Sequence, residues 1–123
     1  MKARVLLVED QEDNRRIVRD LLTSAGYELI EAVTGEDGVR LAEAEHPDLI
    51  LMDIQLPGMD GYEATRRIRQ TPGLTTTPII AVTSYALSGD EMKALAAGCT
   101  AYVAKPFSPR ALLATVRACL GSP

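Results

Sequence analysis

The run LILMD (Leu49–Asp53) is apolar up to its last residue, which is an aspartate. A short apolar run of this kind is typical of a strand that is buried on both faces, as in a parallel sheet. Three further runs, Arg4–Val8, Pro78–Val82 and Ala101–Ala104, are also nearly continuous in apolar residues. Glu28–Ala32 alternates more, so we expect it nearer an edge of the sheet.

Helix signals fill the gaps between these runs. Thr34–Asp37 and Ser88–Glu91 each place a hydroxyl three residues before an acid, which is a helix-start pattern. Ser108 followed by a proline predicts another helix start. Gly26 ends a segment whose apolar residues recur every three or four positions. A shorter helix is expected over about Tyr62–Arg69.

This alternation of strands and helices predicts an α/β fold. The expected architecture is a doubly wound (βα)5, flavodoxin-like fold with a five-stranded parallel sheet in the order 2-1-3-4-5 and helices on both faces. With 123 residues, of which 46% are hydrophobic, we expect one domain over residues 1–123.

Composition argues against several partners. The net charge of −4 and the 4% aromatic content do not favour a nucleic-acid surface. The apolar runs are too short to cross a membrane, and no secretory signal precedes the first run, so we expect a cytoplasmic protein. Cys99 and Cys119 have no metal-ligand spacing, and no disulfide is expected.

Polar residues follow four of the predicted strands directly. The first strand leads into Glu9 and Asp10, the third ends in Asp53, the fourth ends in Thr83, and the fifth is followed by Lys105. Ligands of doubly wound folds bind at the carboxyl ends of the strands. We therefore expect these side chains to meet at one edge of the sheet.

Clustered carboxylates repel one another, and a divalent cation relieves that repulsion. Oxygen ligands without His or Cys favour Mg²⁺ over Zn²⁺, and Mg²⁺ often binds a phosphate oxygen as well. Asp53, on the central strand, is the expected nucleophile toward phosphorus, with Glu9 and Asp10 holding the metal. Lys105 and Thr83 would bind other phosphoryl oxygens.

Each of these residues also has a simpler interpretation when it is taken alone. Asp10 could be a helix N-cap, Asp53 a turn residue and Lys105 a solvated loop lysine. Their joint placement at separate strand ends favours the metal and phosphoryl site. One helix beside the site carries three arginines, Arg15, Arg16 and Arg19. We expect a solvated helix face there; the alternative is that these arginines steer an acidic partner.

The chain closely resembles the CheY-like receiver domains of bacterial two-component response regulators. Four motifs carry the resemblance: VLLVED (Val5–Asp10), DLILMDIQLPGMDG (Asp48–Gly61), PIIAVTSYA (Pro78–Ala86) and AYVAKPF (Ala101–Phe107). The DNR of Asp13–Arg15 and the MDIQLPGMDG stretch look most like phosphorelay receivers, either stand-alone DivK-like proteins or domains of hybrid kinases.

The resemblance implies a role for each residue of the metal site. Asp53 matches the phosphoacceptor, and it also contacts the metal. Asp10 matches the direct Mg²⁺ ligand, and Glu9 matches the acid that acts through a metal-bound water. Gln55 matches the residue whose backbone carbonyl completes the shell. The implied cofactor is Mg²⁺, with Mn²⁺ as a possible substitute.

The resemblance also implies how a phosphoryl group is held and sensed. Thr83 and Lys105 match the phosphoryl-binding hydroxyl and ammonium, and the Lys105–Pro106 bond matches one that is cis in the family. Thr83 and Tyr102 match a coupled switch pair. Two polar side chains occupy positions that tune dephosphorylation in such proteins, Gln55 and Tyr85.

The implied partners are a histidine kinase or a histidine phosphotransfer protein and a downstream protein target. The implied output surface comprises a helix over about Gly89–Ala97, the strand Ala101–Ala104 and the last helix. Because the sequence ends at Pro123, we expect a stand-alone regulator, although an excised domain is the alternative. We expect no enzymatic activity beyond its own phosphoryl transfer and slow autodephosphorylation.

Other functions fit the sequence less well. A phosphatase with an aspartyl nucleophile needs an acid two residues after it, where this chain has Gln55. A flavin or nucleotide module needs a phosphate-binding loop after the first strand, but the acidic Glu9–Glu12 would repel phosphate. A degenerate receiver that acts only as a scaffold would not need the intact set of acids, Thr83 and Lys105.

Overall fold

The computed structural model describes residues 2–83 and 90–120. Strands and helices alternate along the chain, as predicted. Their bounds are β1 (Arg4–Val8), α1 (Glu12–Ser24), β2 (Glu28–Ala32), α2 (Gly35–Glu45), β3 (Leu49–Asp53), α3 (Gly61–Arg69), β4 (Ile79–Thr83), α4 (Asp90–Ala97), β5 (Ala101–Ala104) and α5 (Pro109–Leu120).

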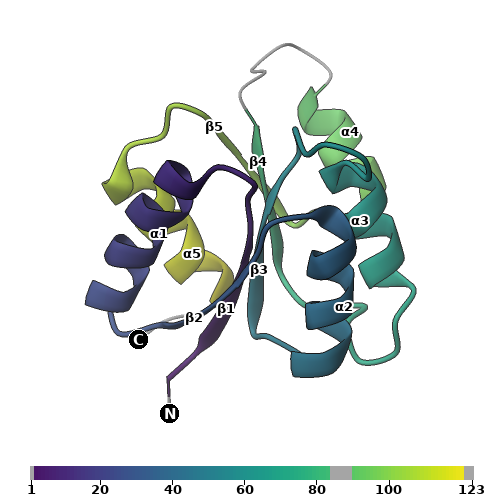
Figure 1. Ribbon diagram of the computed structural model, residues 1–123, viewed down its shortest axis with the longest axis horizontal. Helices are drawn as coiled ribbons and strands as arrows, with labels where there is room; N and C mark the ends of the chain where they lie inside the picture. Colours follow the sequence, from purple (N-terminus) through teal and green to yellow (C-terminus); the bar gives the residue numbers. More distant parts are fainter. Residues whose placement is uncertain (1, 84–89, 121–123) are drawn as a thin grey trace.

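The sheet has the predicted topology. Its strands are parallel and lie in the order β2-β1-β3-β4-β5, so the doubly wound α/β fold is confirmed. Figure 1 shows the sheet between two helical layers, with α1 and α5 on one face and α2, α3 and α4 on the other. None of the helices in the described ranges has the length and apolarity that a membrane span requires.

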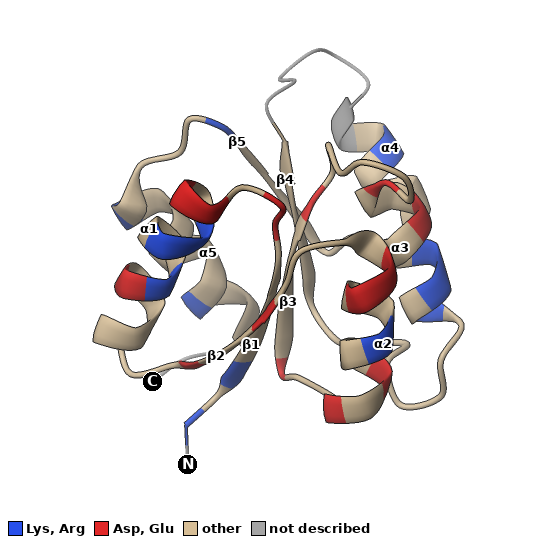
Figure 2. Cartoon of the chain, in the orientation of Figure 1, with Lys and Arg blue, Asp and Glu red and all other residues tan. Residues whose placement is uncertain are grey.

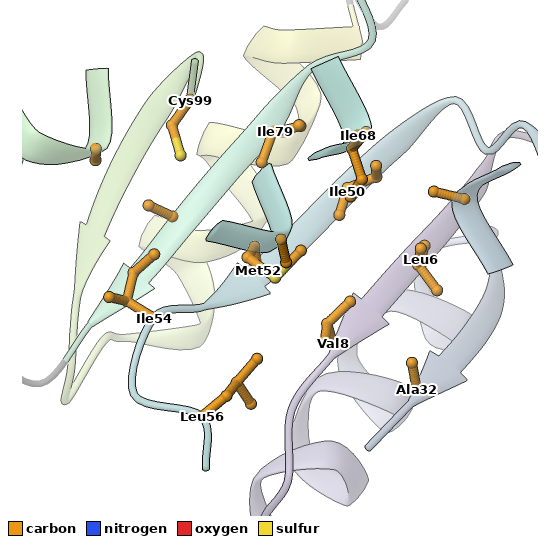
Figure 3. Packing of buried hydrophobic residues seen from close by; sticks show 14 of the residues in the cluster. Leu6, Val8, Ala32, Ile50, Met52, Ile54, Leu56, Ile68, Ile79 and Cys99 are labelled. Carbon is orange, nitrogen blue, oxygen red and sulfur yellow. The ribbon is translucent and has the colours of Figure 1, made fainter. Parts of the chain in front are cut away.

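Alternate residues of the central strands fill two separate cores, because successive side chains of a strand point to opposite faces. On β3, Ile50 and Met52 belong to the core beneath α2, α3 and α4, whereas Leu49 and Leu51 belong to the core beneath α1 and α5. Figure 3 shows the first of these cores, with the Ile50 and Met52 side chains directed into it. Both faces of β3 are therefore buried, as its apolar run predicted.

The two edge strands are less buried. The prediction for β2 is confirmed, since it lies at one edge and only Ala32 is fully buried. The prediction for β5 is wrong in one respect: its run was interpreted as buried on both faces, but all four residues are half-buried. β5 has a neighbouring strand on one side only, so solvent reaches the other side.

Two of the predicted helix caps are present. The Asp37 N–H donates to Thr34 Oγ1 at 3.0 Å at the start of α2, and the Ala111 N–H donates to Ser108 Oγ at 3.0 Å at the start of α5. Gly26 follows the end of α1 with φ of 95°, a conformation that favours glycine. The cap predicted at Ser88 lies outside the described residues.

The remaining helix predictions agree closely with the structure. The helix expected from about Tyr62 begins one residue earlier as α3, where Asp60 Oδ1 accepts a hydrogen bond from the Glu63 N–H at 2.9 Å. Within the described residues, α4 begins at Asp90.

Both cysteines are free; Cys99 is buried and Cys119 is half-buried.

Candidate functional site

The predicted site residues meet at the carboxyl end of the parallel sheet. Glu9 and Asp10 directly follow β1, Asp53 ends β3, Thr83 ends β4, and Lys105 directly follows β5. In Figure 2, acidic residues lie at the ends of β1 and β3, on the edge of the sheet that also carries the end of β4. The parallel arrangement thus brings residues from four strands together.

Three of these residues form a candidate metal centre. Glu9, Asp10 and Asp53 can each offer one carboxylate oxygen such that the three oxygens lie within 4.8 Å of one another. Glu9 and Asp53 are buried, with 4% and 3% of their surface exposed, whereas Asp10 is partly exposed. A set of hard oxygen ligands open to solvent on one side fits Mg²⁺ and not a thiolate- or imidazole-preferring ion.

Backbone N–H groups fix the two buried carboxylates. The Gln11 N–H donates to Glu9 Oε2 at 3.1 Å, and the Gln55 N–H donates to Asp53 Oδ1 at 3.1 Å. In each case the donor lies two residues after the acid, so the local turn orients the side chain. One oxygen of each carboxylate is left for other partners.

Lys105 bridges those remaining oxygens. Its Nζ donates to Glu9 Oε1 at 2.9 Å and lies 3.4 Å from Asp53 Oδ2. The Lys105 side chain is 17% exposed, so it is held at the site and is not a freely solvated lysine. The contact to Glu9 is the shorter one, so the positive charge of Lys105 stabilises the Glu9 carboxylate more than the Asp53 carboxylate.

The two buried acids have pKa values that are shifted in opposite directions. Burial and the neighbouring Glu9 carboxylate raise the pKa of Asp53 from 3.8 to about 7. Burial also raises the pKa of Glu9, but hydrogen bonds with Lys105, with Asp53 and with the Gln11 backbone outweigh that effect and leave the pKa below its ordinary value. Without a cation, therefore, Asp53 is the acid that retains a proton.

The start of α3 lies directly against Asp53. A Cβ atom added at Gly61 would lie 2.3 Å from the Asp53 carbonyl oxygen and 2.8 Å from Ile54 Cα. The Gly61 N–H donates to the Ile54 carbonyl at 3.1 Å, and the Ile54 N–H donates to the Val82 carbonyl at 3.0 Å. Glycine at position 61 therefore allows the close approach of backbone that fixes the end of β3.

Thr83 has a partner that the sequence did not indicate. The Gln55 Nε2 donates to Thr83 Oγ1 at 2.5 Å, and the Thr83 side chain is fully buried. The Lys105 N–H donates to the Thr83 carbonyl at 2.6 Å, which joins the ends of β4 and β5. The sequence does place both residues at the ends of neighbouring strands, which makes a contact between them feasible. Whether the hydrogen bond forms depends on the side-chain rotamers, which the sequence does not give.

The other predicted residues are placed as follows. The Lys105–Pro106 peptide bond is cis, as predicted. Tyr102 is half-buried and packs against the core beneath α2, α3 and α4. Tyr85, predicted to tune dephosphorylation, lies outside the described residues.

Two simpler interpretations of residues near the site do not agree with the structure. Asp10 is not the N-cap of α1, because Gln11 occupies that position and makes no side-chain cap hydrogen bond. Arg15 is not on a solvated face: its side chain is 12% exposed, and its Nη1 donates to the Glu9 carbonyl oxygen at 2.9 Å. The rotational position of α1 on the sheet decides this contact, and the sequence alone does not give it.

Comparisons with known proteins agree with this geometry. A model of the response regulator receiver domain family matches residues 5–117. The polar-differentiation response regulator DivK of Brucella ovis is 43% identical over 121 residues, which cover 98% of each chain.

Solved structures give the same result. The receiver domain of a sensor histidine kinase from Pseudomonas aeruginosa, with Mg²⁺ coordinated in its active-site cleft, has a TM-score of 0.92 and 41% identity over 99% of this chain and 100% of that one. A chemotaxis protein of the CheY type from Vibrio cholerae has a TM-score of 0.93 and 32% identity over 98% and 100% of the two chains. The chain belongs to the response regulator receiver domain family of two-component signalling.

Proposed function

We propose that residues 1–123 form a single receiver domain that accepts a phosphoryl group on Asp53. The donor is the phosphohistidine of a histidine kinase or of a histidine phosphotransfer protein. The observation that carries this proposal is the convergence of three carboxylates and one ammonium group at the ends of separate strands. Asp53 is the central acid of this group, since β3 is the middle strand of the sheet.

The proposed cofactor is Mg²⁺, held by Glu9, Asp10, Asp53 and the backbone carbonyl of Gln55; Mn²⁺ is expected to substitute for it. The donor chemistry of the acidic cluster fits such an ion, and the Pseudomonas receiver domain holds Mg²⁺ in its own cleft. When bound, the cation supplies positive charge that offsets the charge of the carboxylates and of the phosphoryl oxygens.

In the proposed transfer, an Asp53 carboxylate oxygen forms the new bond to phosphorus as the donor's nitrogen–phosphorus bond breaks. The donor histidine keeps the electron pair of that bond. Asp53 Oδ1 is oriented by the Gln55 N–H, so Oδ2 is the oxygen that remains for attack. Lys105 Nζ, 3.4 Å from Oδ2, is placed to donate to a phosphoryl oxygen.

We propose that Thr83 reports the phosphoryl group to the rest of the fold. Its hydroxyl accepts a hydrogen bond from Gln55, so turning toward a phosphoryl oxygen changes that contact. Tyr102 then moves into the space that is left, and the face of α4, β5 and α5 changes its affinity for a downstream protein. This is a population shift between two states of one fold.

The chain is a signalling protein, and its proposed chemistry is limited to its own phosphoryl transfer and slow autodephosphorylation. Gln55 and Tyr85 are proposed to set the rate of the second reaction. The proposed location is the cytoplasm, where histidine kinases take phosphoryl groups from ATP. Protein contacts are the proposed output, without nucleic-acid or membrane binding.

Intact-mass measurement after incubation with acetyl phosphate tests the proposal. We expect one phosphoryl adduct that requires Mg²⁺, is formed by the wild type and is absent in Asp53→Asn. Asp48→Asn, at an exposed aspartate before β3, is the matched control and should keep the adduct. Absence of any adduct in the wild type, or an equal adduct in Asp53→Asn, would contradict the proposal.

A further inference from the structure

Arg15 is tied to the backbone that carries two of the three acids. Its Nη1 donates to the Glu9 carbonyl oxygen at 2.9 Å. This carbonyl belongs to the peptide bond between Glu9 and Asp10, so the guanidinium group holds the link between those two residues. Arg15 is also more buried than Arg19, with side-chain exposures of 12% and 37%.

Two acids hold the Arg15 guanidinium in place. Its Nη2 pairs with Glu12 one turn earlier on α1, and its Nε lies 3.6 Å from Glu31 Oε1 on β2. Arg19 binds both oxygens of the same Glu31 at 2.8 Å, which fixes that carboxylate in turn. In Figure 2, acidic and basic residues adjoin along α1 accordingly. The planar guanidinium group is thus oriented on several sides.

Asp10 is the acid whose position depends most on the backbone. Glu9 and Asp53 each receive a backbone N–H and contact Lys105. Within residues 2–83 and 90–120, the Asp10 side chain has no hydrogen bond or ion pair that would orient it. Rotation of the Glu9–Asp10 peptide would move this carboxylate away from the other two, and the bond from Arg15 resists that rotation.

We propose that Arg15 is a positioning residue of the metal centre: by holding the Glu9 carbonyl, it keeps the Asp10 carboxylate in the cluster with Glu9 and Asp53. The inference rests on the proposed Mg²⁺ site. Outer residues that orient metal ligands typically change metal affinity by about 10- to 100-fold when they are removed. Arg15 would act in this way through the backbone, without touching the metal or the phosphoryl group.

The sign of the effect separates positioning from simple electrostatics. Arg15 and Arg19 are both positive groups near a cation site, so loss of either charge should favour Mg²⁺ binding by Coulomb's law. Loss of positioning has the opposite effect and applies only to Arg15, because Arg19 binds Glu31 and Glu12 but not the Glu9 carbonyl. Weaker Mg²⁺ binding in an Arg15 variant therefore cannot arise from its charge.

The test is the Mg²⁺ dissociation constant, measured by isothermal titration calorimetry on the wild type, Arg15→Met and Arg19→Met. We expect Arg15→Met to bind Mg²⁺ about 10-fold or more weakly. Arg19→Met, the matched control on the same helix, should bind as tightly as the wild type or more tightly. If Arg15→Met does not fold, Arg15→Gln replaces it with the same expectation, because glutamine is too short to span the contact.

An Arg15 variant that binds Mg²⁺ as tightly as the wild type overturns the inference. So does an Arg19→Met protein that loses as much affinity as Arg15→Met, because the effect would then belong to the ion-pair network and not to the Glu9 carbonyl. If the wild type itself binds no Mg²⁺, the proposed metal site fails first. The wild-type titration thus separates the two failures.

Discussion

Lys105 lies between two buried carboxylates and supplies positive charge where a metal would also supply it. Its ammonium contacts Glu9 and Asp53 at 2.9 and 3.4 Å. Two carboxyl groups so close together are costly to ionise in a buried site, and one partly buried ammonium offsets part of that cost. Lys105 therefore has a role in the stability of the unphosphorylated protein as well as in the proposed transfer.

Replacement of Lys105 by methionine should destabilise the metal-free protein. Removal of one partner of a partly buried ion pair leaves the carboxylates uncompensated, and we expect a loss of about 2 kcal/mol in the free energy of unfolding. Urea denaturation in the presence of a chelator measures this loss. Lys93→Met, on the exposed part of α4, is the control and should change little. Equal stability of both variants would contradict the bridging role.

Asp53→Asn should stabilise the metal-free protein at neutral pH. The pKa of Asp53 is raised from 3.8 to about 7 in the fold, so the folded state binds its proton more tightly than the unfolded state does. The carboxylate therefore destabilises the fold increasingly from about pH 4 to pH 7, by up to about 4 kcal/mol. The advantage of the variant should grow over this range and be smallest below pH 4.

Unfolding curves of Asp53→Asn and wild type between pH 4 and 8, in a chelator, check this dependence. Asp20→Asn, at an exposed position on α1, is the control and should follow the wild type. A difference between Asp53→Asn and wild type that is constant with pH, or that grows as the pH falls, would show that burial and Glu9 do not raise the pKa of Asp53.

The residues at the strand ends could be predicted from the sequence, whereas several contacts between side chains could not. Asp53 and Lys105 were predictable because apolar runs mark the strands and parallel strands end at one edge. The Gln55–Thr83 hydrogen bond and the Arg15 contact were not, because they depend on rotamers and on the rotation of α1. Those quantities follow from the packed structure and have no local sequence signal.

At the scale of elements, the connection from β3 to α3 is the tightest part of the site. Asp60 caps α3, and Gly61 lets the helix begin against the backbone of Asp53. Backbone atoms on both sides of the contact leave no flexible side chain to move away. The geometry of this connection and the position of Asp53 are therefore linked.

Gly61→Ala should weaken both the fold and the metal site. Its methyl group would lie 2.3 Å from the Asp53 carbonyl oxygen, so the backbone must shift, at a cost of about 1–3 kcal/mol. We also expect weaker Mg²⁺ binding, because the shift moves Asp53. Chemical denaturation and calorimetric Mg²⁺ titration measure the two effects.

Gly26→Ala is the control for this prediction. Gly26 has φ of 95° and no atoms near its missing Cβ, so the substitution strains only its own backbone, far along the chain from the site. It should cost about 1 kcal/mol in stability and leave the Mg²⁺ affinity unchanged. A Gly61→Ala protein with wild-type Mg²⁺ affinity would contradict the link between this connection and Asp53.

The sequence predicted where the strands and helices lie along the chain. It predicted less well how buried each strand is and which residue caps each helix. The β5 run is apolar like the others, yet its residues are half-buried because it is an edge strand. Apolar composition does not distinguish an edge strand from a central one when the edge is partly covered by helices. Similarly, an aspartate before a helix is compatible with a cap, but Asp10 precedes the actual N-cap by one residue and remains available to a cation.

In the molecule as a whole, buried acidic side chains lie at the carboxyl end of the parallel sheet. A bound cation would offset the cost of burying their charge. Glu9 and Asp53 are almost fully buried in a chain of net charge −4. A cation that binds the folded state and not the unfolded chain stabilises the fold by mass action. Binding of the proposed Mg²⁺ at this site would therefore link the stability of the fold to the cation.

Mg²⁺ should raise the stability of the wild-type protein, and a chelator should reverse the effect. At a Mg²⁺ concentration 100 times the dissociation constant, the expected gain is about 2.7 kcal/mol in the free energy of unfolding. Thermal unfolding with Mg²⁺ and with a chelator measures it, with Asp10→Asn as the variant that should gain much less. The same gain in both proteins would indicate a nonspecific salt effect.

The most direct measurement is the chemical identification of the phosphorylated residue. Borohydride reduction converts an aspartyl phosphate to homoserine, and peptide sequencing by mass spectrometry then locates it among the acids of the site. After treatment with acetyl phosphate and Mg²⁺, we expect homoserine at position 53, with Glu9, Asp10, Asp48 and Asp60 unchanged. Reduction at another acid, or at none, would contradict the assignment of Asp53 as the phosphoacceptor.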